Sequence, residues 1–328
     1  ADGVAEVHGI LLTLGFVGTV VALERAVAAN RTLGYLAPSA LGTAAVLLVL
    51  PVPPQVANAA LLIGTAALTG LYVPLWRRNT DIAVLIQAGG AVLAVGAAVL
   101  WSAHLPVPTL LPWLCGFLIL TIAGERLELT RIVNSSFRTE ATLAGIAAVY
   151  LAGALAALLW PDLGYRLLGA TLLVMTGWLA THDVARRTVR GTGLPRYMAV
   201  CLLTGYAWLL VPAGAWLLIG QVPGGRGYDA IVHAVMLGFV MSMIMAHAPV
   251  ILPAVLRRPL PYTPVMYGPV VLLHVSLLLR IAVGDAGDGQ GAVQLGGVLN
   301  IVAVLGFVVV AVFSASRRNT HEVKRVSV

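Results

Sequence analysis

Long apolar runs, separated by short polar, Pro- or Gly-containing breaks, follow one another along almost the whole chain. The hydrocarbon core of a bilayer is about 30 Å thick, and an α-helix needs about 20 apolar residues to cross it. The runs are continuously apolar, whereas the strands of a membrane barrel alternate apolar and polar side chains, so the pattern favours helices. It predicts eleven spans, at residues 4–28, 33–51, 55–76, 80–101, 107–129, 139–160, 164–185, 196–220, 227–256, 263–283 and 291–315.

The composition agrees with an integral membrane protein. Hydrophobic residues make up 59% of the 328 positions and charged residues only 10%, and the mean hydropathy is +0.95. The predicted fold is therefore an all-α, polytopic transmembrane helical bundle. We expect residues 1–316 to form a single transmembrane domain and residues 317–328 a short basic cytoplasmic tail. Cys115 and Cys201 belong to no recognisable metal or disulfide motif.

The net charge of +7 reflects topology and does not point to nucleic acid. If eleven spans are counted, 17 of the 20 basic residues fall on one side of the membrane. Basic loops mark the cytoplasmic side, which puts the amino terminus outside and the carboxyl terminus inside a bacterial cytoplasmic membrane. The lipid bilayer is then the main partner of the chain. Whether a redox protein also binds it is left open by the sequence, and the pattern does not indicate an oligomeric state.

Two of the few polar residues at membrane depth are histidines near the predicted outer boundary. His8 lies about one turn into the first span and His233 six residues into the ninth, so both lie within about 10 Å of that boundary. Two imidazoles at matched depth could ligate one b-type haem. Gly15, seven positions after His8 on the same helical face, would let the macrocycle approach the backbone, and Arg280 could pair with a propionate. The alternatives are hydrogen-bonded packing histidines and an arginine that extends to the lipid headgroups.

A second pair of histidines lies deeper in the membrane. His247 follows His233 by fourteen positions, which in a regular α-helix puts the two on one face about 21 Å apart. His274, on the returning tenth span, has a similar depth, and the pair could hold copper or a second haem, with Met243 as a soft neighbour. The alternative is that His247 bonds a carbonyl freed by Pro249.

Charged pairs end two spans on the predicted cytoplasmic side. Glu24-Arg25 closes the first span and Glu125-Arg126 lies near the end of the fifth. Unpaired charges at this depth would be costly, so we expect an interhelical ion-pair cluster. The functional alternative for the same residues is a proton entry point.

The segments from His8 to Arg25 and from His233 to Pro253 resemble the haem-ligand helices of the haem-copper oxidase superfamily, and more closely those of the NnrS family of haem- and copper-containing membrane proteins. His8 ahead of Gly15-Phe16 matches one helix, and His233 ahead of a Gly- and Met-rich run matches the other. In the oxidases these are helices two and ten of twelve; here they are one and nine of eleven, as if a leading helix lay outside this sequence. The resemblance implies haem ligation by His8 and His233, and an association with nitric oxide and nitrosative stress.

The chain also departs from the oxidase pattern. The fifth and sixth spans lack the copper-ligating histidines, and Ile231 stands where a second haem ligand would be. An oxygen-reducing centre is therefore not expected, and no catalytic residue is assigned. Three hypotheses stay open: a haem b protein in electron transfer or nitric oxide defence, a transporter for a metal or small molecule, and a structural or assembly subunit.

Overall fold

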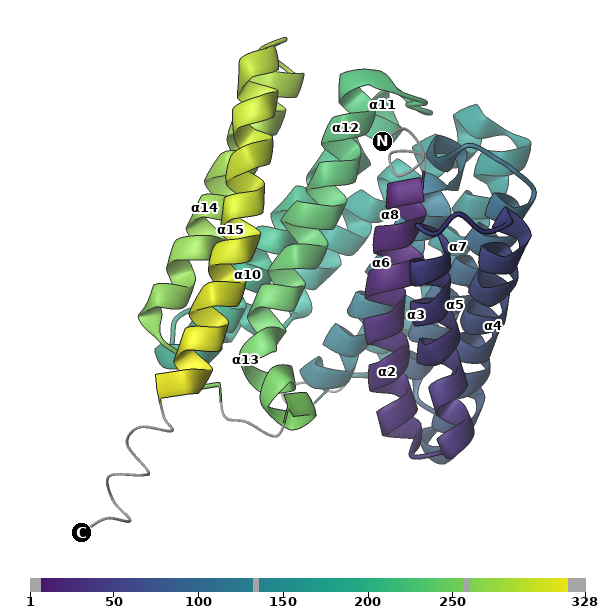
Figure 1. The fold of residues 1–328 in the computed structure, drawn as a ribbon, viewed down its shortest axis with the longest axis horizontal. Helices are drawn as coiled ribbons and strands as arrows, with labels where there is room; N and C mark the ends of the chain where they lie inside the picture. The colour runs from purple at the N-terminus through teal and green to yellow at the C-terminus, as the bar shows by residue number, and fades with distance from the viewer. Residues whose placement is uncertain (1–6, 132–135, 257–259, 318–328) are drawn as a thin grey trace. The chain divides into compact units, whose positions relative to one another are not determined.

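A computed structural model describes residues 7–131, 136–256 and 260–317, and every regular element in these ranges is helical (Figure 1). The helices group into two compact units, Ala1–Thr171 (unit 1) and Leu172–Val328 (unit 2).

Ten helices of the described ranges are long and apolar enough to cross a membrane. An eleventh, Thr32–Leu47, is shorter and replaces the predicted span 33–51. It consists of a four-residue 3-10 turn and a 12-residue α-helix, about 26 Å in all, and it ends ahead of a proline-containing segment. The prediction of a polytopic helical bundle is thus confirmed. The ten long helices are Val7–Ala29, Pro54–Arg78, Ile82–Ser102, Val107–Thr130, Phe137–Leu159, Pro161–His182, Gly193–Leu218, Gly225–Ile251, Pro264–Asp285 and Gln290–Ala315.

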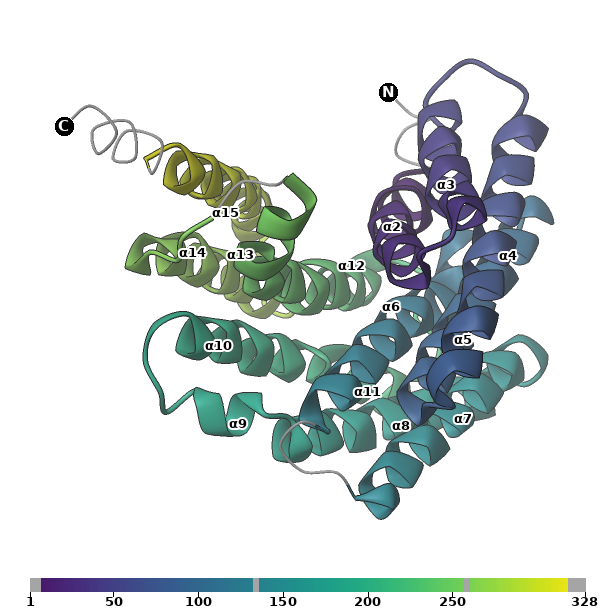
Figure 2. The same cartoon turned by 90° about the horizontal axis from the view of Figure 1, so that it is seen from below.

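Unit 1 is organised around α6. In the most apolar stretch of this helix 78% of the residues are buried, the highest value among the ten long helices. Helix α5 packs against it along most of its length, because Gly90 and Gly124 let the backbones approach (Figure 2). A Cβ at Gly90 would lie 2.8 Å from the Phe117 carbonyl oxygen. The elements are η1 (Leu11–Val17), α2 (Gly18–Ala29), η2 (Thr32–Tyr35), α3 (Leu36–Leu47), α4 (Pro54–Asn79), α5 (Ile82–Ser102), α6 (Val107–Thr130), α7 (Phe137–Leu159) and the start of α8 (Pro161–His182).

In unit 2, α10 packs against η3 and α13, and α14 lies beside α15 (Figure 1 and Figure 2). A small buried cluster of Trp208, Ala234 and Leu277 joins α10, η3 and α14. After the rest of α8, the elements are α9 (Ala185–Thr188), α10 (Gly193–Trp208), α11 (Leu210–Leu218), α12 (Gly225–His233), η3 (Ala234–Met241), α13 (Ser242–Leu256), η4 (Pro264–Met266), α14 (Tyr267–Leu278), η5 (Leu279–Asp285) and α15 (Gln290–Arg317).

Three of the membrane helices contain a π-helical segment, η1, η3 and η5. A π-turn closes its hydrogen bonds from i to i+5, so each residue rotates less about the axis than in an α-helix. The predicted shared faces are therefore wrong. His8 is exposed in unit 1 whereas Gly15 is buried, and His233 lines a pocket together with Leu237 and Met241, four and eight positions further along the chain.

An ion-pair cluster ties together helix ends on one side of unit 1. Arg131, just beyond α6, pairs with Asp81 and with Glu140 of α7, and the hydrogen bond to Glu140 raises the pKa of Arg131 above its ordinary value. Asp81 also accepts a hydrogen bond from the backbone N–H of Ala83 and so caps α5. In unit 2, α15 runs to Arg317; the rest of the predicted tail, 318–328, lies outside the described residues.

Candidate functional site

His233 is the last residue of α12, at the point where the helix changes to π geometry. Its Nδ1 lies 2.8 Å from the carbonyl oxygen of Asp229, one turn earlier, and 3.3 Å from the carboxylate of the same residue. With a proton on Nδ1, Nε2 is the ring nitrogen left with a lone pair. Metal-ligating histidines are commonly oriented in this way, by a carbonyl or carboxylate on the other nitrogen.

The backbone bond alone does not single out His233. Nδ1 of His182 and Nδ1 of His247 lie 3.0 and 2.8 Å from the carbonyl oxygen four residues earlier. Other helical histidines of this chain therefore make the same contact. What distinguishes His233 is the added carboxylate of Asp229 and its place in a pocket wall.

Arg280, within η5, forms a two-pronged ion pair with Asp229. Its Nε and Nη2 each donate to one oxygen of the carboxylate, both at 2.9 Å, and its Nη1 donates to the carbonyl oxygen of Val293 at 3.3 Å. Asp229 thus joins His233 and Arg280 in one chain of contacts between α12 and η5. A haem propionate at this level would share the guanidinium with Asp229 and would not meet an unpaired cation.

The pocket beside His233 has a volume of about 430 Å³ and a mostly apolar wall. Asn300 of α15 adds a polar group to it and is only 3% exposed. One end of its amide contacts the Ser276 hydroxyl at 2.6 Å, and the nitrogen has no partner among the described residues. Whichever way the amide is turned, one of its polar atoms stays unpaired, because Ser276 reaches only one end. The lining residues are His233, Leu237, Met241, Arg280, Gly297, Asn300, Ile301, Val304 and Leu305.

The remaining predicted outer residues, His8 and Gly15, belong to unit 1. His8 is exposed in the first turn of the helix Val7–Ala29. Gly15 serves helix packing, because a Cβ there would lie 2.9 Å from the Cβ of Ala45 in α3. It does not open space beside His8. Since His8 and His233 belong to different units, their ligation of one iron stays a prediction.

His274, predicted as an inner metal ligand, has both ring nitrogens engaged within unit 2. Trp208 donates its indole N–H to Nδ1 at 2.9 Å, and the two rings are nearly parallel, with 6° between their planes. Because the indole nitrogen can only donate, Nδ1 must be the acceptor and Nε2 must carry the proton. Nε2 lies 3.0 Å from the Thr204 hydroxyl and 3.5 Å from that of Ser242. The donor set of His274 therefore does not fit a metal in this conformation.

No group of three or more His, Cys, Asp or Glu side chains arranged to hold a metal ion occurs in the ranges that the structure describes. His247 bonds the Met243 carbonyl, a backbone contact of the kind predicted as the alternative to a metal, although the carbonyl freed by Pro249 is not the one it uses. Copper or a second haem at His247 and His274 stays a prediction, and the contacts of His274 argue against it.

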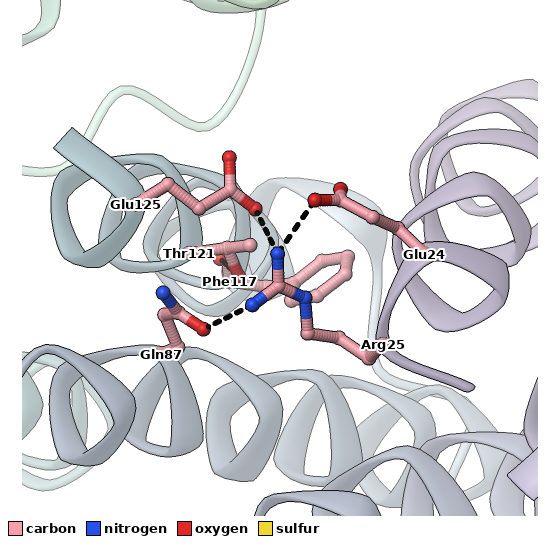
Figure 3. A network of polar contacts seen from close by, with 6 residues as sticks. All are labelled: Glu24, Arg25, Gln87, Phe117, Thr121 and Glu125. Carbon is pink, nitrogen blue, oxygen red and sulfur yellow. Dashed lines mark hydrogen bonds and ion pairs between the residues drawn. The ribbon is translucent and has the colours of Figure 1, made fainter. Parts of the chain in front are cut away.

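A second polar cluster lies in unit 1, where α2, α5 and α6 meet (Figure 3). Nη2 of Arg25 contacts Glu24 at 2.6 Å and Glu125 at 3.4 Å, and Nη1 donates to the side-chain oxygen of Gln87 at 2.9 Å. The predicted interhelical ion-pair cluster is confirmed.

Sequence reasoning missed Asp229, Asn300 and Trp208. Asp229 precedes His233 by one helical turn, a spacing that could have suggested an orienting carboxylate. Asn300 is an amide within an otherwise apolar span, which could have marked it as a polar site. Nothing local marks Trp208 as the partner of His274, because the two are 66 positions apart.

One comparison with known proteins gives a match. The model of a family described as a domain of unknown function (DUF8744) matches residues 1–316. No curated protein and no solved structure matches the chain.

Proposed function

The chain belongs to the DUF8744 family, and we propose that it is a haem b protein of the bacterial cytoplasmic membrane that acts in electron transfer or in defence against nitric oxide. His233 is one axial ligand of the haem in this proposal, and His8 is the other. In this proposal the helix Thr32–Leu47 counts as an eleventh crossing, so the amino terminus is outside and the carboxyl terminus cytoplasmic, and a redox protein exchanges electrons at the outer face.

The observation that carries the proposal is the setting of His233. Its Nδ1 is held by the carbonyl and carboxylate of Asp229, and its ring lies in the wall of a largely apolar pocket. A neutral imidazole with an oriented Nε2 suits iron, and an apolar wall excludes water from the site. Asp229 keeps the ligand in one tautomer, and Arg280 keeps Asp229 in place through two hydrogen bonds.

The positions of the π-helical segments give independent support. Segment η1 begins three residues after His8, η3 begins directly after His233, and η5 begins one residue before Arg280. Isolated π-segments inside α-helices are frequent at functional sites. Three residues proposed for one site on chemical grounds therefore each adjoin the same uncommon backbone feature.

A bound haem, which His233 and His8 would hold, would supply a one-electron redox centre. The chain itself would contribute two neutral imidazoles as ligands, and the guanidinium of Arg280 near the charged propionates of the haem. The Asp229–Arg280 pair is already neutral, so propionates would depend on Arg280 only in part.

The test is an optical spectrum of the protein purified from cells supplied with haem precursor, with a pyridine haemochrome assay. We expect a Soret band and paired α and β bands, both lost in His233→Ala and in His8→Ala. His182→Ala is the matched control, because His182 makes the same bond to a helical carbonyl and has no carboxylate partner within the described ranges. A colourless wild-type protein refutes the proposal, and loss in only one of the two variants refutes ligation by both histidines.

A further inference from the structure

The polar cluster in unit 1 carries a surplus of negative charge. Glu24 and Glu125 approach the same guanidinium nitrogen of Arg25 (Figure 3). Two more charged side chains of α6, Arg126 and Glu128, act on Glu125 electrostatically. The two carboxylates of Glu24 and Glu125 against the one guanidinium of Arg25 leave one negative charge, and a single bound proton would make these three side chains neutral. Burial in a membrane span favours that neutral state over the charged one.

The cluster also holds hydrogen-bonding groups that are left over. The side chain of Gln87 is fully buried, and that of Tyr72 on α4 is 2% exposed. The Gln87 amide nitrogen, the Tyr72 hydroxyl and Nε of Arg25 all lack a partner among the described residues. Figure 3 shows the Gln87 side chain directed at Arg25, and Tyr72 lies close enough to interact with that guanidinium electrostatically. Buried groups of this kind are nearly always satisfied, and two of the three can only donate, so together they leave room for an acceptor such as a water molecule beside the carboxylates.

The exposure of the cluster is graded. Glu24 is 40% exposed, Glu125 is 26% exposed and Arg25 is 10% exposed, as side chains. Arg25 lies four residues before the end of the span Val7–Ala29, and Glu125 five residues before the end of Val107–Thr130. At 1.5 Å per residue the cluster is about 6–8 Å inside one end of both helices. Water at that end can therefore reach Glu24 first. Arg25 and the fully buried Gln87 form the side of the cluster that lies farthest from water.

We propose that Glu24, Glu125 and Arg25 form a proton-binding site that takes up one proton from water at the membrane face where α2 and α6 end. The proton adds to a carboxylate oxygen of Glu24 or Glu125, while Arg25 stays charged and holds both carboxylates. No electron is transferred. The groups that face the site are Glu24 and Arg25 of α2, Tyr72 of α4, Gln87 of α5, and Glu125, Arg126 and Glu128 of α6. The proposal does not depend on haem binding.

The first test is an infrared pH titration of the full-length protein in lipid nanodiscs, in H₂O and in D₂O. We expect a protonated-carboxyl C=O band that appears as the pH is lowered, shifts in D₂O, and is lost in Glu125→Gln. Glu24→Gln, which removes the more exposed partner, should move the titration or abolish it. Glu128→Gln is the matched control, because Glu128 is an exposed carboxylate three residues further along α6, and it should keep the band. A band unchanged in both Glu24→Gln and Glu125→Gln overturns the proposal.

The second test needs no variant, so it holds even if Glu125→Gln fails to fold. Dicyclohexylcarbodiimide modifies carboxyl groups that are protonated in apolar surroundings. Peptide mass spectrometry of the treated wild-type protein should find the adduct on Glu125 or Glu24, with at least a several-fold lower yield on Glu128 and a yield that falls as the pH rises. Equal labelling of all three carboxylates, or labelling of none, means that the cluster is only an ion pair and overturns the proposal.

Discussion

Replacing Gly238 with alanine should destabilise unit 2, because Gly238 is where η3 packs directly onto Trp208. An alanine Cβ at this position would lie 2.3 Å from Cγ of Trp208 and 2.7 Å from its Cβ and Cδ1. Ordinary carbon contacts are about 3.5–4.0 Å, so the tryptophan or the helix must shift by an ångström or more. Trp208 cannot retreat freely, since its indole nitrogen is held 2.9 Å from Nδ1 of His274.

The size of the effect follows from two opposing terms. Overpacking a close contact costs about 1–3 kcal/mol, and the rigid ring atoms involved here put the cost near the upper end. Alanine gains about 0.5–1 kcal/mol over glycine in a helix, which offsets part of it. We expect Gly238→Ala to lose about 2 kcal/mol. Gly177→Ala, on α8, meets nothing within 4 Å and should gain about 0.5–1 kcal/mol instead, so the two variants should differ by about 3 kcal/mol.

The assay is equilibrium unfolding in mixed micelles titrated with SDS and followed by far-ultraviolet circular dichroism. Both variants add the same single methyl group, so their opposite signs can come only from their surroundings. If Gly238→Ala is as stable as the wild type, the close packing of η3 on Trp208 does not constrain this part of the chain, and the reasoning is wrong.

Three other substitutions test the polar contacts. Trp208→Phe removes the N–H donor to His274 and leaves a partly buried ring nitrogen unpaired, which should cost about 1–2 kcal/mol in the same unfolding assay. Arg131→Met leaves two carboxylates, each 10% exposed, without their cation; breaking a buried pair costs about 3–5 kcal/mol, and the 29% exposure of Arg131 puts the expected loss at about 3 kcal/mol. Asp229→Asn removes the charge that orients His233 and pairs with Arg280, and under the haem proposal it should weaken haem retention about 10- to 100-fold in a haem-transfer assay.

Each of these has a matched control at an exposed position. Trp160→Phe, Arg138→Met and Asp288→Asn change the same residue types where the side chain is open to the surroundings, and each should be nearly neutral. If a control loses as much as its buried counterpart, the loss reflects the residue type and not the contact. Haem retention unchanged by Asp229→Asn would remove the orienting role assigned to that carboxylate.

The membrane-spanning architecture could be predicted from the sequence because hydrophobicity is a local and additive property. A run of about 20 apolar residues is most stable across the bilayer core whatever its neighbours are. Ten of the eleven predicted spans are accordingly long apolar helices in the structure. The ion pairing of Glu24, Arg25 and Glu125 could be predicted for a related reason: charges at membrane depth have few ways to avoid a large cost, and pairing is the simplest.

Helix faces and side-chain partners were decided only by the tertiary structure. The shared faces of His8 with Gly15 and of His233 with His247 assumed 100° per residue, and η1 and η3 break that assumption. Such π-segments form where packing or side-chain contacts outweigh regular backbone bonding, so no local periodicity reveals them. The pairs Asp229–Arg280 and Trp208–His274 join residues 51 and 66 positions apart, and which donor meets which acceptor depends on how whole helices pack. The sequence alone thus determined which segments enter the membrane, and the packing of those segments determined what each polar side chain does there.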